Sequence, residues 1–208
     1  MTHVPGGPPS PDDVAPPVLR PLRADDAAAV LSAFRSDPAM SRQGTVRTME
    51  EAEEYVRRLT NPDGTVIAWA VCHEDGLVGL VCIAVDEQNG NGWFSYWMTK
   101  AARGRGWTTR AAVTVADWAL DHAGLERLEL GHRVNNPASG AVARAAGFVR
   151  EGTERGKFLV AGERVDVNTY GRLRTDPRPD GPRLTMSPDG PRLTMSPVAN
   201  HAKEPTRT

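Results

Sequence analysis

The sequence predicts an α/β fold, in which helices flank the β-sheet of a single globular domain. Helical and strand patterns alternate along most of the 208 residues, and Gly- and Pro-rich segments bound them at both ends. One aromatic strand pattern runs into a Gly/Arg turn and then directly into a helical pattern. With 39% hydrophobic and 25% charged residues, the chain can bury a sizeable core. We place the domain at residues 18–174.

Residues 1–17 and 175–208 differ in composition from the domain between them. Both segments lack periodic apolar residues, so we expect them to be disordered tails. The nonapeptide at residues 179–187 is repeated without change at residues 188–196. Nine residues copied once are too short a unit for a solenoid. The repeat is either a recent duplication in an unconstrained tail or a short bivalent docking motif.

Capping signals predict the helices of the first half. Residues 18–22 form a strand pattern, and Asp25 or Asp26 can cap a helix over residues 27–34 that a proline follows. The Thr-Met-Glu-Glu sequence at residues 48–51 has the spacing of a capping box, in which the Thr and Glu side chains satisfy free backbone N–H groups. This box predicts a second helix.

Three further strands are predicted before the middle of the chain. Residues 66–71 and 77–85 are apolar strand patterns, and the Glu-Asp-Gly turn at residues 74–76 joins them as a hairpin. A short turn then leads into the aromatic-rich strand at residues 92–98.

A helix is predicted over residues 109–123, and Gly124 ends it. Its apolar stripe consists of small residues, which lets the helix pack close to a sheet. The stripe contains Ala112, Val115, Ala116, Ala119 and Ala123.

The last part of the domain combines three strands with one helix. Residues 127–134 alternate between apolar and polar side chains, as in a half-buried strand. Asn136-Pro137 opens a helix, with asparagine as the cap and proline in the first helical position, and Gly147 closes it. Strands are predicted at residues 148–151 and 165–173.

The Gly/Arg turn is the candidate site for an anion. A helix N-terminus offers backbone N–H groups that have no partner within the helix, and its dipole favours negative charge. Glycines let the backbone approach a phosphate closely, and arginines add charge-assisted hydrogen bonds. We interpret the turn as a pyrophosphate site formed by Arg103, Gly104, Arg105, Gly106, Trp107 and Thr108.

Composition limits the other partners. A net charge of −1 and a pI near 6.5 give no basic footprint for nucleic acid or a membrane surface, and no apolar run is long enough to span a bilayer. Cys72 and Cys82 lie in apolar strand patterns, which favours small buried side chains in a reducing cytoplasm over a disulfide. The cysteines and the five histidines lack metal-ligand spacing, so we expect no metal.

Six stretches of the chain, taken in order, resemble the GNAT superfamily of acetyl-CoA-dependent N-acetyltransferases, and its RimJ/RimL-like branch most of all. The resemblance covers about residues 18–174. The turn is followed some thirty residues later by Asn136-x-x-Ser139 and then by Gly147-Phe148, and this combination is specific. The stretches are residues 92–97, 102–106, 117–119, 136–139, 146–148 with 151–152, and 166–170.

The resemblance implies a mixed sheet that is splayed between its fourth and fifth strands, with acetyl-CoA in the wedge. It also implies that the pyrophosphate lies on the turn and that pantetheine runs past Met98, close to Asn136. The acceptor amine would attack the thioester directly. Ser139 matches the family position that protonates the leaving CoA thiolate, and the alternative is that this side chain bonds only helix backbone.

The sequence departs from the family pattern at four positions, namely Thr108, Ala143, Phe158 and Arg110, which stands where relatives often carry glutamate. Thr108 stands where relatives usually carry glycine or alanine, although a hydroxyl can also bond a phosphate. The position of the family's acid tyrosine is Ala143, and the glutamate proposed as base in RimL-like enzymes falls on Phe158.

His132 lies on the apolar face of its strand, which favours a core histidine with satisfied hydrogen bonds over a general base.

The sequence therefore predicts acetyl transfer from acetyl-CoA to a primary amine. The amine must be neutral to attack, and the pKa of an α-amino group is about 7.7–8.0, against about 10.4 for lysine. Without a clear base, a protein N-terminal α-amine is favoured. The alternatives are a small-molecule acetyltransferase, acting on a drug, polyamine or amino acid, and an acetyl-CoA-sensing module without turnover. The sequence leaves the oligomeric state open.

Overall fold

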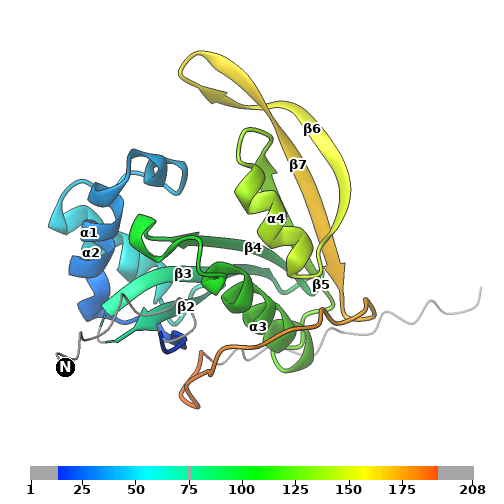
Figure 1. Ribbon diagram of the computed structural model, residues 1–208, viewed down its shortest axis with the longest axis horizontal. Helices are drawn as coiled ribbons and strands as arrows, with labels where there is room; N and C mark the ends of the chain where they lie inside the picture. Colours follow the sequence, from blue (N-terminus) through cyan, green and yellow to red (C-terminus); the bar gives the residue numbers. More distant parts are fainter. Residues whose placement is uncertain (1–13, 75, 192–208) are drawn as a thin grey trace, which may run out of the picture.

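Seven strands form one mixed sheet, in the order β1-β2-β3-β4-β5-β7-β6 (Figure 1). The structure is a computed structural model that describes residues 14–74 and 76–191. Neighbouring strands are antiparallel, except that β4 and β5 are parallel. The strands are β1 (Val18–Pro21), β2 (Val66–His73), β3 (Gly76–Asp86), β4 (Asn91–Met98), β5 (Arg127–Arg133), β6 (Val149–Val160) and β7 (Glu163–Leu173).

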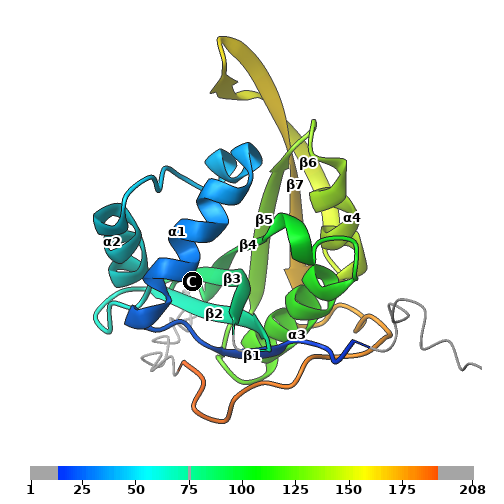
Figure 2. The ribbon, with the colours of Figure 1, turned by 60° about the vertical axis from the view of Figure 1, so that its left-hand side comes forward.

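Helices cover both faces of this sheet (Figure 2). Side chains along β3 alternate accordingly, because Val81 packs in the core cluster that contains α3, whereas Leu80 packs in the cluster that contains α1 and α2. In the part of the chain that the structure describes, no helix is long and apolar enough to cross a membrane. The helices are α1 (Ala27–Ser36), α2 (Met49–Leu59), α3 (Trp107–Asp121) and α4 (Pro137–Ala145).

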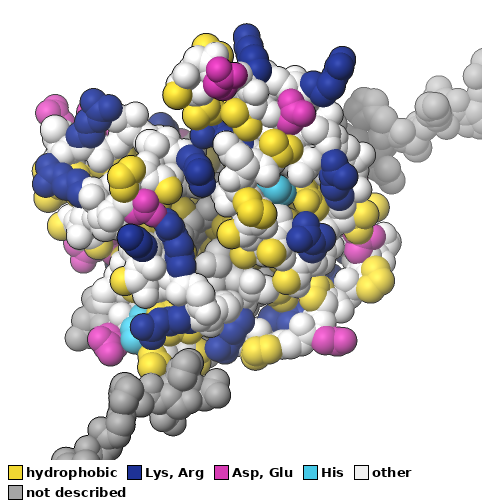
Figure 3. Space-filling model, turned by 45° about the horizontal axis from the view of Figure 1, so that its top comes forward, with side chains coloured by type: hydrophobic (Ala, Val, Ile, Leu, Met, Phe, Trp, Pro, Cys, Tyr) yellow, Lys and Arg dark blue, Asp and Glu magenta, His cyan; other side chains and the backbone are white. Residues whose placement is uncertain are grey.

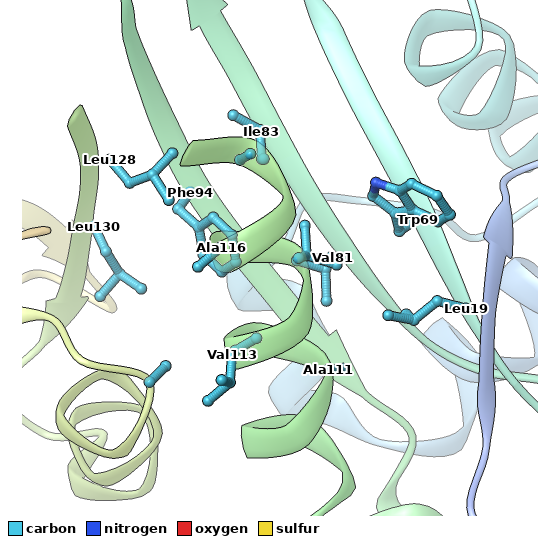
Figure 4. Packing of buried hydrophobic residues seen from close by; sticks show 14 of the residues in the cluster. Leu19, Trp69, Val81, Ile83, Phe94, Ala111, Val113, Ala116, Leu128 and Leu130 are labelled. Atoms are coloured by element: carbon cyan, nitrogen blue, oxygen red, sulfur yellow. The ribbon is translucent and has the colours of Figure 1, made fainter. Parts of the chain in front are cut away.

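The predicted stripe of small residues on α3 is confirmed. Figure 4 shows α3 lying over labelled side chains of β3, β4 and β5. Small side chains allow this close approach, because they leave little volume between the helix axis and the sheet. Five of them have no solvent exposure: Ala112, Val115, Ala116 and Ala119 of the predicted stripe, and Ala111 beside it.

β4 and β5 separate soon after they begin, and this separation creates the site. Their parallel register runs from Asn91 and Arg127 to Trp93 and Glu129. β4 then continues along β3 to Met98, while β5 continues along β7. The C-terminal halves of the two strands therefore leave a wedge between them, which confirms the predicted mixed, splayed sheet.

Local signals predicted several caps correctly and one incorrectly. Thr48 and Glu51 form the expected capping box of α2, and Asn136 caps α4. The predicted side-chain cap of α1 is wrong. The Asp26 carboxylate instead accepts hydrogen bonds of 2.6 and 2.7 Å from the Arg20 guanidinium, so it closes an ion pair with β1.

The C-terminal hairpin is longer than the sequence indicates. A strand was expected at residues 148–151, but β6 extends to Val160 and turns through Ala161 and Gly162, whose φ angles are 49° and 87°. β6 and β7 form the arm that extends beyond the rest of the sheet in Figure 1. Most side chains of β6 are exposed, so the strand carries no apolar alternation that could have revealed it.

The structure also differs from the predicted domain boundary at residue 174. Residues 175–191 lie against the domain, and Leu184 is only 5% exposed within the core cluster around α3. A single buried leucine among polar residues makes no periodic apolar pattern. For this reason the composition of the segment indicated a disordered tail. The other parts of the expected tails, residues 1–13 and 192–208, lie outside the described residues.

Candidate functional site

Two adjoining cavities occupy the wedge between β4 and β5. The larger has a volume of about 370 Å³ and reaches the Gly/Arg turn. The smaller has a volume of about 240 Å³ and reaches the β6–β7 arm. Five residues line both cavities and so mark their junction: Arg42, Gln43, Tyr96, Asn136 and Ser139.

The larger cavity is lined by the turn that the sequence indicated. Gly104 and Gly106 have φ angles of 79° and 72°, a left-handed conformation that glycine adopts without strain. Gly106 is the N-cap of α3, and the first hydrogen bond of this helix is donated by Arg110 to the Gly106 carbonyl. The N–H groups of the first turn therefore have no partner within the helix and can bind an anion.

Six of the eight residues predicted to bind the cofactor line this cavity, namely Met98, Arg103, Gly104, Gly106, Thr108 and Asn136. Arg105 and Trp107 do not line it. The Arg105 guanidinium lies 5.0 Å from the centroid of the Trp107 ring, and Trp107 is buried in the core. The side chain of Trp107 thus packs inside the domain, while its backbone N–H belongs to the first turn of α3.

Arg103 holds the two sides of the larger cavity together. Its Nε donates to the Met98 carbonyl at 3.0 Å, and its Nη1 donates to the Asp37 carboxylate at 2.5 Å. The pKa of Asp37 is lowered by the backbone N–H of Ala39 and by Arg103. Arg103 therefore connects the end of β4 to the short 3-10 helix Pro38–Arg42, which also lines the cavity.

Tyr96 and Ser139 face each other at the junction of the cavities. The Tyr96 hydroxyl donates to the Ser139 carbonyl at 2.8 Å, and the two side-chain oxygens are 3.1 Å apart. Burial raises the pKa of Tyr96 to about 12, so this hydroxyl keeps its proton at neutral pH. The backbone N–H of Ser139 donates to the capping side chain of Asn136 at 3.4 Å. The wedge therefore contains the protonated hydroxyl of Tyr96, which is hydrogen-bonded to Ser139.

Tyr96 is the functional candidate that sequence reasoning missed. In an aromatic-rich strand pattern, a tyrosine is expected in the core or in the wall of a groove. The sequence of β4 did contain a signal for its position. Phe94, Tyr96 and Met98 are alternate residues, so they lie on one face of the strand, and this face packs with α3. Ala143, which stands at the position of the family's acid tyrosine, is fully buried, so it offers no alternative group.

The smaller cavity has aromatic and basic walls. Phe158 of β6 and Trp93 of β4 are both partly exposed, and the guanidinium of Arg133 lies 5.1 Å from the centroid of the Phe158 ring. Lys157 Nζ lies 5.7 Å from the centroid of the Trp93 ring. Cation–π contacts of this kind fix the position of basic groups beside the opening.

His132 lines the smaller cavity but has partners at both ring nitrogens. Its Nδ1 lies 2.9 Å from the Arg133 carbonyl oxygen, and its Nε2 lies 3.2 Å from the Tyr170 hydroxyl. The side chain is buried. This geometry agrees with the prediction of a core histidine whose hydrogen bonds are satisfied.

The lining of both cavities is basic. It includes Arg42, Arg103 and Arg133, and no Asp or Glu is found among the described residues that line either cavity. In Figure 3, Lys and Arg side chains lie along one side of the central hollow of the surface, and hydrophobic side chains lie along the other. An anion is therefore favoured in the wedge, and a polycation is disfavoured.

The cysteines lie outside both cavities. Cys72 and Cys82 are free thiols, and burial raises the pKa of both, that of Cys82 to about 12. Within residues 14–74 and 76–191 there is no group of three or more His, Cys, Asp and Glu side chains that could hold a metal ion.

Comparison with known sequences identifies the folded part of the chain as an acetyltransferase domain. A family model described as an acetyltransferase (GNAT) domain matches residues 18–149. The Bacillus subtilis protein named "Probable N-acetyltransferase YjcK" is 27% identical over 170 residues, which are 76% of this chain and 94% of that protein. The Escherichia coli ribosomal-protein-serine acetyltransferase is 28% identical over 101 residues, which are 48% of this chain and 56% of that enzyme. The match thus spans little more than half the length of the Escherichia coli relative.

Solved structures with the same fold include two acetyltransferases. The ribosomal L7/L12 α-N-protein acetyltransferase RimL, in complex with coenzyme A, aligns with a TM-score of 0.69 and 22% identity over 74% of this chain and 92% of that chain. A chimera of the spermidine N-acetyltransferase SpeG from Vibrio cholerae and hSSAT aligns with a TM-score of 0.69 and 21% identity over 77% of this chain and 97% of that chain. At these identities the likeness establishes the fold.

Proposed function

Because the chain belongs to the GNAT acetyltransferase family, we propose that it is an N-acetyltransferase that transfers an acetyl group from acetyl-CoA to a primary α-amine at the junction of the two cavities. The observation that carries this proposal is the position of the Tyr96–Ser139 pair, which lines both cavities. One cavity would hold the acyl donor and the other the acceptor.

Acetyl-CoA would occupy the larger cavity, with its pyrophosphate on the N–H groups at the start of α3. The left-handed backbone at Gly104 and Gly106 supports this position, because beyond the adjoining backbone no heavy atom lies within 4 Å of where a Cβ would stand at either residue. That space is open for a phosphate. Pantetheine would then pass Met98 and Asn136, which brings the thioester to Ser139.

In the proposed reaction, the neutral amine nitrogen attacks the thioester carbonyl carbon from the smaller cavity. The new C–N bond forms as the C–S bond breaks, and the amine proton leaves to water. The CoA thiolate takes a proton from the hydroxyl pair formed by Tyr96 and Ser139, and the pair regains a proton from water. Burial keeps the Tyr96 hydroxyl protonated at neutral pH, so a proton is in place when the thiolate forms.

An α-amine is the preferred acceptor because no carboxylate among the described residues lines the smaller cavity as a base. Near neutral pH the neutral fraction of an α-amine exceeds that of a lysine side chain by about 10²-fold, given their ordinary pKa values. The basic lining formed by Arg42 and Arg133 further favours an acceptor with an anionic group beside the amine. A protein N-terminus followed by acidic residues has both properties, and so does a small amino acid.

The polyamine alternative is disfavoured by the same charges. Spermidine is the substrate named for the SpeG chimera, but a polycation would meet arginines instead of carboxylates in this wedge. An acetyl-CoA sensor without turnover remains the non-enzymatic alternative, and it predicts cofactor binding without release of thiol.

Release of CoA thiol over a panel of amines tests the proposal. The panel contains a short peptide with a free N-terminus and acidic second and third residues, the same peptide with a blocked N-terminus and one lysine, and spermidine. We expect release with the first peptide to be faster by at least about 10-fold, because its amine is neutral more often and its charges suit the lining. Preferential acetylation of spermidine would contradict the assigned acceptor, and tight acetyl-CoA binding with no release over the whole panel would favour the sensor.

A further inference from the structure

The first copy of the repeated nonapeptide, residues 179–187, is bound to the domain as an added strand. β1 lies at the edge of the sheet, and its Leu19 N–H donates to the Thr185 carbonyl at 2.8 Å. The Ser187 N–H donates back to the Leu19 carbonyl at 2.7 Å, which makes a parallel bridge between Leu19 and Met186. In Figures 1 and 2 this segment, drawn in orange, runs past α3 and beside β1.

Side chains of the first nonapeptide make specific contacts with α3. Leu184 is buried in the core cluster, and its N–H donates to the Thr114 hydroxyl at 2.9 Å. Arg183 donates through Nε to the Asp117 carboxylate at 2.7 Å. Thr114 and Asp117 are one turn apart on α3, so both recognise the peptide from the same helix face.

Arg183 also shapes the peptide itself. Its two terminal nitrogens donate to the carbonyls of Gly181 and Pro179 at 2.7 and 2.8 Å, which closes the Pro-Asp-Gly-Pro turn onto the guanidinium. The bound conformation therefore depends on groups that the nonapeptide carries within its own sequence.

The second copy, residues 188–196, carries the same groups in the same order. Arg192 corresponds to Arg183, Leu193 to Leu184 and Ser196 to Ser187. Residues 192–208 lie outside the described residues, so the correspondence rests on sequence identity. We propose that the edge of β1 together with Thr114 and Asp117 of α3 is a binding site for this nonapeptide sequence, and that residues 188–196 of the same chain are its second occupant.

The first copy is the preferred occupant because of its flanking residues. Arg178 pairs with Asp121 and Asp117, and a shift by nine residues puts Ser187 in the place of Arg178. Gly190 packs so closely on Trp69 that a Cβ would lie 2.3 Å from the indole, whereas the shift brings Ala199 there. The shift also lengthens the connection after Leu173 by nine residues, which lowers the population of the shifted state by about fivefold.

Amide hydrogen exchange at Leu19 tests this proposal in the full-length chain, because its N–H is protected by the bound peptide. The variants are Leu184→Asp, the matched control Leu193→Asp, and the double variant. We expect Leu193→Asp to match the wild type, since the first copy stays bound. Leu184→Asp should lose only part of the protection and stay clearly above the double variant, because the second copy replaces the first at the cost of the longer connection and of the Arg178 and Gly190 contacts. The double variant should lose protection by about 10²-fold, as expected when a buried leucine site is emptied.

A synthetic peptide with the sequence Pro-Asp-Gly-Pro-Arg-Leu-Thr-Met-Ser, added to the double variant, should restore protection, whereas a scrambled peptide should not. If the double variant with aspartate at positions 184 and 193 does not fold, alanine at both positions replaces it in the same comparison. Equal loss of protection in Leu184→Asp and in the double variant would overturn the proposal. Protection in Leu184→Asp that depends on protein concentration would also overturn it, because the occupant would then come from another chain.

Discussion

Replacing Gly106 by valine is expected to weaken acetyl-CoA binding by at least about 10²-fold, as measured by isothermal titration calorimetry. Gly106 has a φ of 72° and is the N-cap of α3. A left-handed conformation costs a residue with a Cβ roughly 1–2 kcal/mol, and a β-branched side chain has little freedom to adapt. The new side chain would also enter the open space where the proposed pyrophosphate lies, and each charge-assisted bond lost there costs about 1.5–3 kcal/mol.

Arg105→Ala is the matched control for this substitution. Arg105 belongs to the same turn, but it stacks on Trp107 and does not line the larger cavity. Its removal should weaken binding far less than the valine does. Circular dichroism must show that both variants remain folded, because strain at Gly106 also lowers the free energy of unfolding. Unchanged affinity in a folded Gly106→Val protein would mean that the pyrophosphate lies elsewhere.

Replacing Tyr96 by phenylalanine is expected to lower kcat by about 10²-fold while leaving the acetyl-CoA Kd nearly unchanged. The substitution removes the hydroxyl 3.1 Å from Ser139 Oγ and keeps the ring that packs against Phe94. The effect belongs at the lower end of the range for general acids, because the CoA thiolate, with a thiol pKa near 8.5, can also take a proton from water.

Ser139→Ala separates the two roles of the pair. If both hydroxyls act as one proton relay, the effects of the single substitutions should not add in the double variant. If Ser139 bonds only helix backbone, its loss should lower the melting temperature by an amount that corresponds to about 1 kcal/mol, with turnover nearly intact. A Tyr96→Phe enzyme with wild-type kcat would remove Tyr96 from the mechanism.

The pH dependence of the wild-type rate gives an independent check on Tyr96. Burial raises the pKa of Tyr96 to about 12, so the protonated form needed for an acid persists below about pH 11. Deprotonation of the acceptor amine should therefore raise kcat/KM between about pH 6 and 9, with no loss from the acid in that interval. A fall in kcat/KM that begins near pH 9 would indicate an acid with an ordinary thiol or amine pKa.

Local sequence signals predicted the geometry around the larger cavity well. The two glycines of the turn, the small-residue stripe of α3 and the Asn136 cap are each determined by a few neighbouring residues, so their geometry can be inferred from the sequence. The larger cavity follows from these elements, because the turn and α3 form one of its walls.

The junction of the two cavities depends on contacts between distant segments. Tyr96 and Ser139 are 43 residues apart in sequence, and their proximity follows from where α4 lies beside the splayed end of β4. The length of β6 was missed because its side chains are mostly exposed and polar. The nonapeptide was predicted to be disordered because its contacts with Leu19 and Asp117 join it to parts of the chain that local patterns do not connect.

A crystal structure of the wild-type protein with coenzyme A would test the central claim most directly. The account predicts that the pyrophosphate accepts hydrogen bonds from N–H groups at the start of α3, beside Gly104 and Gly106. It also predicts that the CoA sulfur lies within about 4 Å of Ser139 Oγ or the Tyr96 hydroxyl, a range from which a proton can be transferred after small adjustment. A sulfur atom outside the junction of the two cavities, or a pyrophosphate away from the turn, would contradict the account.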